Sequence, residues 1–265
     1  MEPRLHSPAN PWLTMKEARH ALTTGLGRGV RIAVLDTGVD TTHPKLDGLT
    51  LRDDLAVVDD GVQLRVVPGE GADAFGHGTA IVGVLRQLAP EAEIGSFRVL
   101  GSLLRARTPA ICEGVKLAIE RGYHILNCSF GCSRADQVLL YKEWIDDAYV
   151  KGRHIVAACN NADLTRREWP GHFPTVLTVN FIQSAVAETL FHRPGTLVEF
   201  SARGQDIEVP WVGGGVKRVT GSSFAVPHVA GLLARLLSAY PDLPPLEAKS
   251  LLKRLAEPEP RPSKG

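Results

Sequence analysis

The amino-acid sequence predicts a single α/β domain, built on a doubly wound, mainly parallel sheet with helices on both faces. Two observations support this fold class. Short, continuously apolar runs recur along the chain, as expected for strands that are covered on both faces. Helical patterns lie between these runs, which is the order of βαβ units. The apolar runs are Val30 to Asp36, Ile94 to Leu100, His124 to Phe130, His154 to Asn160 and Thr175 to Phe181.

The segments between and after these runs have helix signals. Thr108 is expected to cap a helix because Pro109 suits the first helical position, and Gly122 is expected to end that helix. Three more helices are expected at Ala135 to Val150, Val229 to Tyr240 and Pro244 to Ala256, and a surface hairpin at Leu55 to Val67. We place the domain at residues 1–256. Residues 257–265 are proline-rich and polar, so we expect a disordered tail there.

The composition excludes several classes of protein. The 265 residues are 44% hydrophobic and 22% charged, which is ordinary for a globular protein and excludes a disordered chain, a coiled coil or a collagen-like fibre. The net charge of +1 gives no electrostatic reason to expect nucleic acid or a membrane as partner. No apolar run is long enough for a membrane span, and the N-terminus lacks the apolar core of a secretory signal. Together with only four cysteines, which lack zinc-site spacing, this predicts a cytoplasmic protein without a metal.

Three segments have residues suited to chemistry, near places where strands end or helices begin. Asp36 ends the first apolar run, His77 lies in Gly-His-Gly-Thr before an apolar helical run, and Ser223 lies in the segment 221–231. Each has an ordinary structural interpretation: a turn aspartate, a helix-start histidine and an N-capping serine. Ser222 is the better cap candidate, which leaves Ser223 free. In doubly wound folds the site lies at the carboxyl ends of the strands, where such residues meet.

Together these residues give the order Asp, His, Ser. A serine hydroxyl is a weak nucleophile until an imidazole removes its proton, and a carboxylate fixes the tautomer of that imidazole. The segments DTGVDTTHP, GHGTAIVGVL and GSSFAVPHVAG resemble the three catalytic motifs of the subtilisin family of serine peptidases, and the similarity runs from about Trp12 to about Ala256. The resemblance implies a subtilisin-like fold and a serine endopeptidase that forms an acyl-enzyme, with Asp36, His77 and Ser223 as its triad.

The same resemblance implies the residues that bind substrate. LNCSFG supplies Ser129, Phe130 and Gly131, which would pair with a peptide or protein substrate as an added strand and form one wall of the pocket for P1, the residue before the scissile bond. VAACNN places Asn160 at the position of the oxyanion asparagine. Further substrate contacts are implied for Gly101, Ser102, Leu103, Ala157, Ala158 and Cys159. The oligomeric state is not predicted.

This sequence departs from the family pattern at several positions, and each departure predicts a property of the protein. Only a short segment precedes Asp36, so we expect a catalytic domain without a pro-domain. Cys159 replaces a glycine of the family, which predicts a restricted P1 pocket. The histidine-motif helix runs directly into Ala89-Pro90 without the usual calcium loop, and Lys45 stands where many relatives have an aspartate ligand. A charged ammonium cannot coordinate calcium, so we expect no calcium at that site and no other cofactor.

Other functions fit the sequence less well. An α/β-hydrolase requires a GxSxG segment, which is missing, and a metal hydrolase lacks HExxH or comparable spacing. A non-catalytic peptide-binding module on a subtilase scaffold would normally lose a triad residue. The expected role is intracellular processing with restricted specificity, because a peptidase without an inhibitory pro-domain must be restrained in another way. General intracellular protein degradation is the alternative.

Overall fold

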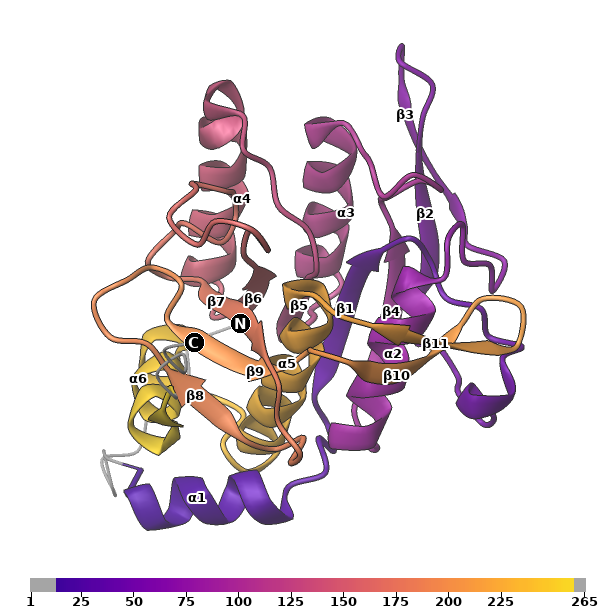
Figure 1. Cartoon of the computed structure of the whole chain (residues 1–265). Coiled ribbons are helices and arrows are strands. Elements are labelled where there is room, and N and C mark those ends of the chain that lie inside the picture. The colour runs from indigo at the N-terminus through magenta and orange to yellow at the C-terminus, as the bar shows by residue number, and fades with distance from the viewer. Residues whose placement is uncertain (1–12, 260–265) are drawn as a thin grey trace, which may run out of the picture.

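Ten strands form one sheet with helices on both sides in the computed structural model, which describes residues 13–259 (Figure 1). Neighbouring strands are parallel, except that β2 pairs with β3 and β8 with β9 in antiparallel fashion. The sheet is therefore mixed and mainly parallel, as predicted. The strands lie in the order β12 (Glu257–Pro258), β8 (Leu190–His192), β9 (Phe200–Arg203), β7 (Leu177–Ile182), β6 (His154–Ala158), β5 (Ile125–Cys128), β1 (Arg31–Asp36), β4 (Glu93–Arg98), β2 (Asp54–Asp59) and β3 (Leu64–Pro68).

The two faces of the sheet are covered by different helices. Helices α2 (His77–Leu88) and α5 (Ser222–Ala239) share one apolar core with Ile32 and Val34 of β1. Helices α3 (Thr108–Glu120) and α4 (Val138–Val150) share the other core with Ala33 and Leu35. Successive side chains of a strand point to opposite faces. Asp36 therefore follows the parity of Ile32 and Val34 and faces the side on which α2 and α5 lie.

The remaining elements flank this core. Helices α1 (Met15–Thr24) and α6 (Pro245–Leu255) pack with the end of α5 in a small apolar cluster. A separate hairpin of β10 (Ile207–Trp211) and β11 (Gly215–Val219) lies beside α2 (Figure 1). Two short 3-10 helices are found at η1 (Pro44–Leu46) and η2 (Ala135–Gln137), the latter directly before α4. Among residues 13–259, no helix is long and apolar enough to cross a membrane.

The expected start of α5 is wrong by seven residues. The sequence predicts a helix from Val229, whereas α5 begins at Ser222 and contains Pro227. A proline inside a helix removes the hydrogen bond to the carbonyl four residues earlier, here that of Ser223. This carbonyl instead accepts a hydrogen bond from Ser129 Oγ at 2.9 Å, so the helix continues through the proline.

Smaller differences between the predicted and observed bounds appear at the start of α3 and at the C-terminal end of the domain. Thr108 is the first residue of α3 rather than its cap, which is Arg107. Glu257 and Pro258, which were expected to belong to the tail, instead add β12 to the sheet beside β8. Glu259 then accepts a hydrogen bond from Ser201 at 3.0 Å. The rest of the expected tail, residues 260–265, lies outside the described residues.

Candidate active site

Asp36 and His77 form a buried pair at the carboxyl end of β1. Asp36 is the last residue of this strand and His77 is the first of α2. The Nδ1 atom of His77 lies 2.8 Å and 2.9 Å from the two carboxylate oxygens of Asp36. Because a carboxylate only accepts hydrogen bonds, this contact fixes the proton on Nδ1 and leaves Nε2 as the acceptor. The pair can thus present a neutral imidazole as a base.

The electrostatic surroundings of His77 favour its protonated form. Burial alone disfavours the imidazolium and lowers the pKa. The charge and hydrogen bond of Asp36, together with the nearby charge of Asp73, outweigh the effect of burial. The net result is a pKa of His77 that is raised above its ordinary value. A proton taken up by this imidazole during a reaction is therefore stabilised where it is needed.

Asp73 shapes the turn that carries His77, although no sequence motif identified it. Its Oδ1 accepts hydrogen bonds from Thr37 Oγ1 at 2.6 Å and from the backbone N–H groups of Phe75 at 2.9 Å and Gly76 at 2.7 Å. Its Oδ2 accepts from the N–H of Thr79 at 2.8 Å and from its hydroxyl at 2.6 Å. The carboxylate thereby links the loop after β1 to the first turn of α2. An aspartate four residues before the histidine was the only available signal.

The glycine that follows His77 permits a close approach between α2 and the loop that follows β1. A Cβ atom at Gly78 would overlap the carbonyl oxygen of Gly38, and it would lie 3.3 Å from the Cβ of Asp36. Only a glycine therefore allows the first turn of α2 to lie directly on the loop that follows Asp36.

Ser223 is the second residue of α5, and its hydroxyl donates to the carbonyl oxygen of Ser129 at 3.1 Å. Ser129 Oγ in turn donates to the carbonyl of Ser223 and accepts from Asn127 Nδ2 at 3.0 Å. The next residue, Phe224, packs on the imidazole of His77 with ring centroids 5.1 Å apart. Ser223 thus stands beside the Asp36–His77 pair, and its hydroxyl is directed to Ser129 rather than to Nε2. Catalytic hydrogen bonds often form only when substrate is bound.

The prediction that Ser222 caps α5 is wrong. The cap position is Gly221, and Ser222 is the first helical residue. The hydroxyl of Ser222 donates to the carbonyl of Cys159 at 2.8 Å, while its backbone N–H donates to Asn161 Oδ1 at 2.8 Å. Asn161 therefore provides the cap from another segment, and both contacts hold the start of α5 against the end of β6.

A cavity of about 370 Å³ lies beside Ser223 and is lined by many of the residues predicted to bind substrate. The predicted residues in its lining are Phe130, Gly131, Ala158, Cys159, Asn160 and Ser223, and the remaining lining residues are Asn161, Ala162, Glu168 and Ser222. Ser129 is outside this lining but forms two hydrogen bonds with Ser223. Ala157 does not reach the cavity. It is fully buried in the core with α3 and α4, because adjacent residues of a strand point to opposite faces.

The amide of Asn160 is engaged in an unexpected contact. Its Nδ2 donates to Glu168 Oε1 at 2.8 Å, and its Oδ1 accepts from the N–H groups of Ala162 at 3.0 Å and Asp163 at 2.9 Å. The last two bonds fix the direction of the amide, so Nδ2 points toward Glu168, which lines the same cavity as Asn160 and Ser223. An amide nitrogen has two hydrogens, and one of them remains for another acceptor.

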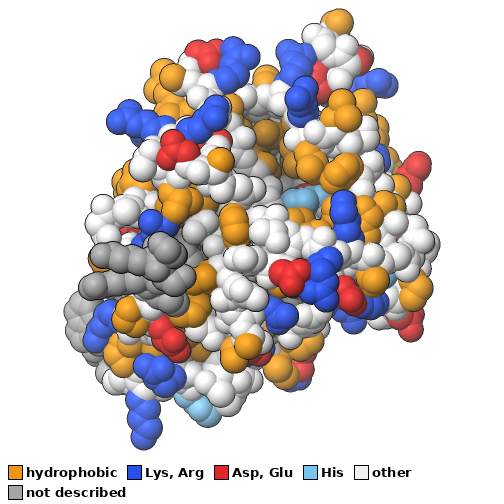
Figure 2. Space-filling model, viewed as in Figure 1, with side chains coloured by type: hydrophobic (Ala, Val, Ile, Leu, Met, Phe, Trp, Pro, Cys, Tyr) orange, Lys and Arg blue, Asp and Glu red, His pale blue; other side chains and the backbone are white. Residues whose placement is uncertain are grey.

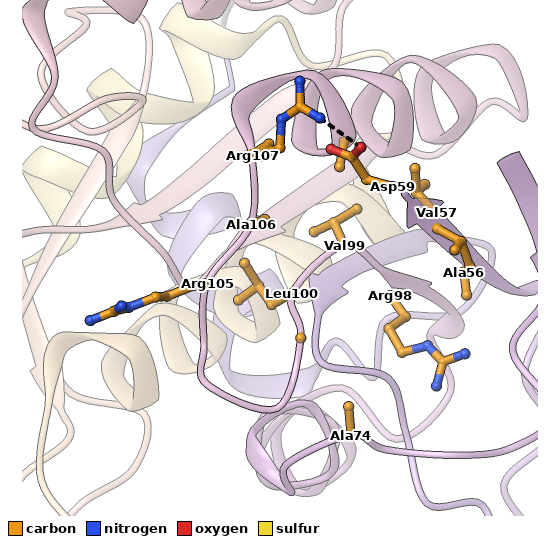
Figure 3. Close-up of a pocket in the computed structure, with 13 residues that line it drawn as sticks. Ala56, Val57, Asp59, Ala74, Arg98, Val99, Leu100, Arg105, Ala106 and Arg107 are labelled. Carbon is orange, nitrogen blue, oxygen red and sulfur yellow. Dashed lines mark hydrogen bonds and ion pairs between the residues drawn. The ribbon is translucent and has the colours of Figure 1, made fainter. Parts of the chain in front are cut away.

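A second cavity, of about 610 Å³, is lined mainly by residues of β2, by the end of β4 and the segment that follows it, and by the start of α3 (Figure 3). It adjoins the pair because the N–H of Leu100 donates to the carbonyl of Asp36 at 3.0 Å. Apolar side chains line it together with Arg98, Arg105 and Arg107, of which Arg107 contacts Asp59 at 2.9 Å (Figure 3). Of the predicted substrate residues 101–103, only Gly101 belongs to this lining, and none belongs to the cavity beside Ser223. In Figure 2 this face of the molecule is hollowed, with a histidine visible in the hollow.

The residues around Lys45 do not fit a calcium ion. Its Nζ atom lies 2.9 Å from Glu208 Oε1, so the available carboxylate already has a cationic partner. Within the described part of the chain, no cluster of three or more His, Cys, Asp or Glu side chains could hold a metal.

Comparison with known proteins identifies the family. The profile of the subtilase family, peptidase family S8, matches residues 27–264. The chain belongs to the subtilase family. It is 29% identical over 259 residues to subtilisin BL from Lederbergia lenta, which covers 93% of this chain and 91% of that relative. It is 28% identical to M-protease from Shouchella clausii, of which it spans 64%.

Solved structures agree with the sequence relatives. A cold-adapted subtilisin-like serine proteinase superimposes with a TM-score of 0.70 at 26% identity, covering 87% of this subtilase and 83% of that chain. Sphericase superimposes with a TM-score of 0.71 at the same identity and coverage. The predictions of fold, family and enzyme class are confirmed: the protein is a subtilisin-like serine endopeptidase.

Proposed function

We propose that this subtilase cleaves peptide bonds with Ser223 as nucleophile, His77 as general base and acid, and Asp36 as the group that orients His77. The observation that carries the assignment is the buried Asp36–His77 pair, held at 2.8 Å next to the start of the helix that carries Ser223. Rotation of the Ser223 side chain from Ser129 toward His77 would complete the triad.

The reaction follows from these positions. Ser223 Oγ attacks the scissile carbonyl carbon as its proton passes to His77 Nε2, and the carbonyl oxygen becomes an oxyanion. His77 then gives this proton to the leaving amine, and the C–N bond breaks to leave an acyl-enzyme. Water attacks the ester by the same route, releases the acid and restores Ser223. The imidazolium formed in each half-reaction is stabilised by Asp36, in line with the raised pKa of His77.

We propose that two groups stabilise the oxyanion. The backbone N–H of Ser223 belongs to the first turn of α5, where N–H groups have no partner within the helix and the helix dipole favours negative charge. Asn160 lines the cavity beside Ser223, and one hydrogen of its Nδ2 is donated to Glu168. We propose that its second hydrogen is donated to the oxyanion.

The test of this assignment uses a serine-directed fluorophosphonate. Ser223 should be labelled with and without a chelator, and Ser223→Ala should lose both labelling and peptide cleavage while it keeps its circular dichroism spectrum and melting temperature. Labelling of another serine, or turnover by purified Ser223→Ala, would contradict the assignment. A protein that binds peptide but shows neither label nor cleavage would be a binding module.

For the biological role, we propose intracellular processing with restricted specificity, and a substrate bound as an added strand along Ser129 to Gly131. Two observations support it. All four cysteines, which lie within the described residues, are free thiols, as a reducing compartment favours. Cys159 also fills part of the cavity wall beside Ser223. Cleavage of an unfolded protein at many unrelated bonds would instead indicate general degradation.

A further inference from the structure

The cavity beside Ser223 contains a carboxylate that no sequence motif predicted. Glu168 is the one charged residue in the described lining of this cavity, and its side chain is half-buried. The other lining residues are apolar, or carry neutral hydroxyl, amide or thiol groups. Burial keeps the Cys159 thiol neutral, because it raises the pKa of this group to about 12. The electrostatic character of the cavity is therefore set by Glu168.

The position of this carboxylate is fixed by contacts on both sides. Oε1 accepts the hydrogen bond from Asn160 Nδ2 at 2.8 Å. Oε2 lies over the backbone of Gly131, where a Cβ atom would be only 2.7 Å away. The following residue, Trp169, exchanges two backbone hydrogen bonds of 2.9 Å with Cys132. The carboxylate thus stands between the two segments that form opposite walls of the cavity.

Glu168 also has an uncompensated charge. None of the ion pairs formed by residues 13–259 includes it. Arg166, two residues earlier in the chain, instead donates to Ser133 Oγ at 3.1 Å, and the adjacent Arg167 is exposed and forms no ion pair with Glu168. Asn160 provides a neutral donor, which leaves the negative charge in place. A substrate that fills the cavity removes water from this carboxylate, which is unfavourable unless the substrate supplies a cation.

The substrate group that enters this cavity is the P1 side chain. Ser223 attacks the P1 carbonyl carbon, which is bonded to the Cα atom that carries this side chain, so a cavity that begins at Ser223 receives it. The walls formed by Phe130 and Cys159 suit an apolar stem, and Glu168 suits a cationic end. Lysine and arginine combine these two features in one side chain.

We propose that Glu168 makes this subtilase selective for arginine or lysine at P1, an inference that rests on the proposed role of Ser223. A neutral P1 side chain would remove water from the carboxylate without supplying a cation to balance its charge. An acidic one would be repelled by it. Glu168 acts here as a determinant of specificity and takes no part in proton transfer.

The test compares peptides that differ only in the charge of P1. Matched fluorogenic peptides carry arginine or citrulline, which have the same shape but differ in charge, and a second pair carries lysine or norleucine. We expect the wild-type enzyme to favour arginine over citrulline by about 100-fold in kcat/KM, in the range measured when one partner of a buried charge pair is lost. A wild-type ratio near one would overturn the proposal without any variant.

Glu168→Gln is the sharpest variant, because its amide oxygen can still accept from Asn160 while the charge is removed. We expect its arginine-to-citrulline ratio to fall to within about threefold of one, with cleavage of the citrulline peptide retained. Glu247→Gln on α6 is the matched control, since Glu247 is exposed and outside the cavity lining. An unchanged ratio in Glu168→Gln would assign the selectivity to another group and refute the proposal.

Failure of the catalytic assignment remains distinguishable from failure of this inference. Fluorophosphonate labelling of Ser223 tests the first, whichever peptide is preferred. Equilibrium binding of the same arginine and citrulline peptides to Ser223→Ala tests the second without any turnover. Equal binding of both peptides would overturn the inference even if Ser223 is labelled, and selective binding of arginine would support it even if another serine is the nucleophile.

Discussion

Asp36→Asn would separate the charge of Asp36 from its size. The substitution keeps the shape of a side chain that is 1% exposed, and removes the carboxylate that accepts from His77 Nδ1 at 2.8 Å. The amide can also donate to Nδ1, which favours the tautomer with its proton on Nε2. That tautomer cannot accept the proton of Ser223. We therefore expect the variant to fold and bind substrate but to react slowly.

The size of the effect follows from the lost attraction. Two unit charges about 4 Å apart attract by about 4 kcal/mol at an effective dielectric constant of 20. Loss of this stabilisation of the imidazolium lowers the rate by about 10³-fold, since about 1.4 kcal/mol corresponds to a factor of ten. The unfavourable tautomer reduces it further, so we expect kcat to fall by 10³- to 10⁴-fold, roughly the loss seen when a triad aspartate is made neutral elsewhere.

The assay is the pH profile of kcat/KM. His77 acts as a base only when neutral, so activity rises with pH through its pKa. Because this pKa is raised, the acidic limb of the wild-type profile should have its midpoint above the ordinary value of 6.5. In Asp36→Asn the midpoint should move to lower pH as the rate falls. A variant with a near-normal rate, or with an unmoved midpoint, would refute the role given to Asp36.

The remaining predictions concern four other features. Cys159→Gly should raise kcat/KM for peptides with large P1 side chains by about tenfold, because a few atoms more or less in a P1 pocket change the preference between small and large side chains by this factor. An unchanged P1 profile in a peptide library would contradict this prediction. Asn160→Ala should lower kcat by about 10²- to 10³-fold with little change in KM, and normal kcat would remove Asn160 from oxyanion binding. Asp73→Ala should lower the free energy of unfolding in urea by about 3 kcal/mol, because it leaves several donors without their charged acceptor; an unchanged value would show that the loop after β1 holds α2 without it. Excess chelator should leave the melting temperature and the activity unchanged. A ligand at a thousandfold excess over its Kd adds about 4 kcal/mol to the free energy of unfolding, so a fall of many degrees in the melting temperature would reveal a calcium site.

The central sheet could be predicted because its strands are buried on both faces and are therefore apolar throughout. The short strands β8 and β9 were not predicted. Each has only three or four residues, Leu190–His192 and Phe200–Arg203, which is too few for a recognisable period. The start of α5 was missed for a different reason. Pro227 signals a break in any local interpretation, and only a hydroxyl from a distant segment compensates for it.

In the candidate site, too, some residues could be predicted from the sequence and others could not. The segments that contain Asp36, His77 and Ser223 could be identified from short motifs, because the chemistry requires fixed residue types with glycines beside them. Glu168 could not, because its place in the cavity depends on the pairing of Trp169 with Cys132, which leaves no local pattern. The side chain of Ala157 lies in the core on the other face of the sheet, which the alternation of side chains along a strand would have predicted once Ala158 was assigned to the cavity.

Pro227 has a mechanical consequence for the enzyme. Since it has no N–H, the carbonyl of Ser223 is free to accept from Ser129, whose own carbonyl accepts from Ser223 Oγ. The main chain of Ser223, the proposed nucleophile, is thereby tied to the segment along which the substrate would lie. When thermal motion displaces the start of α5, the segment that contains Ser129 moves with it. The distance between Ser223 Oγ and the carbonyl of a bound substrate therefore varies less than it would if the two segments moved independently. A helix without this proline would satisfy that carbonyl internally and leave the two segments free to drift apart.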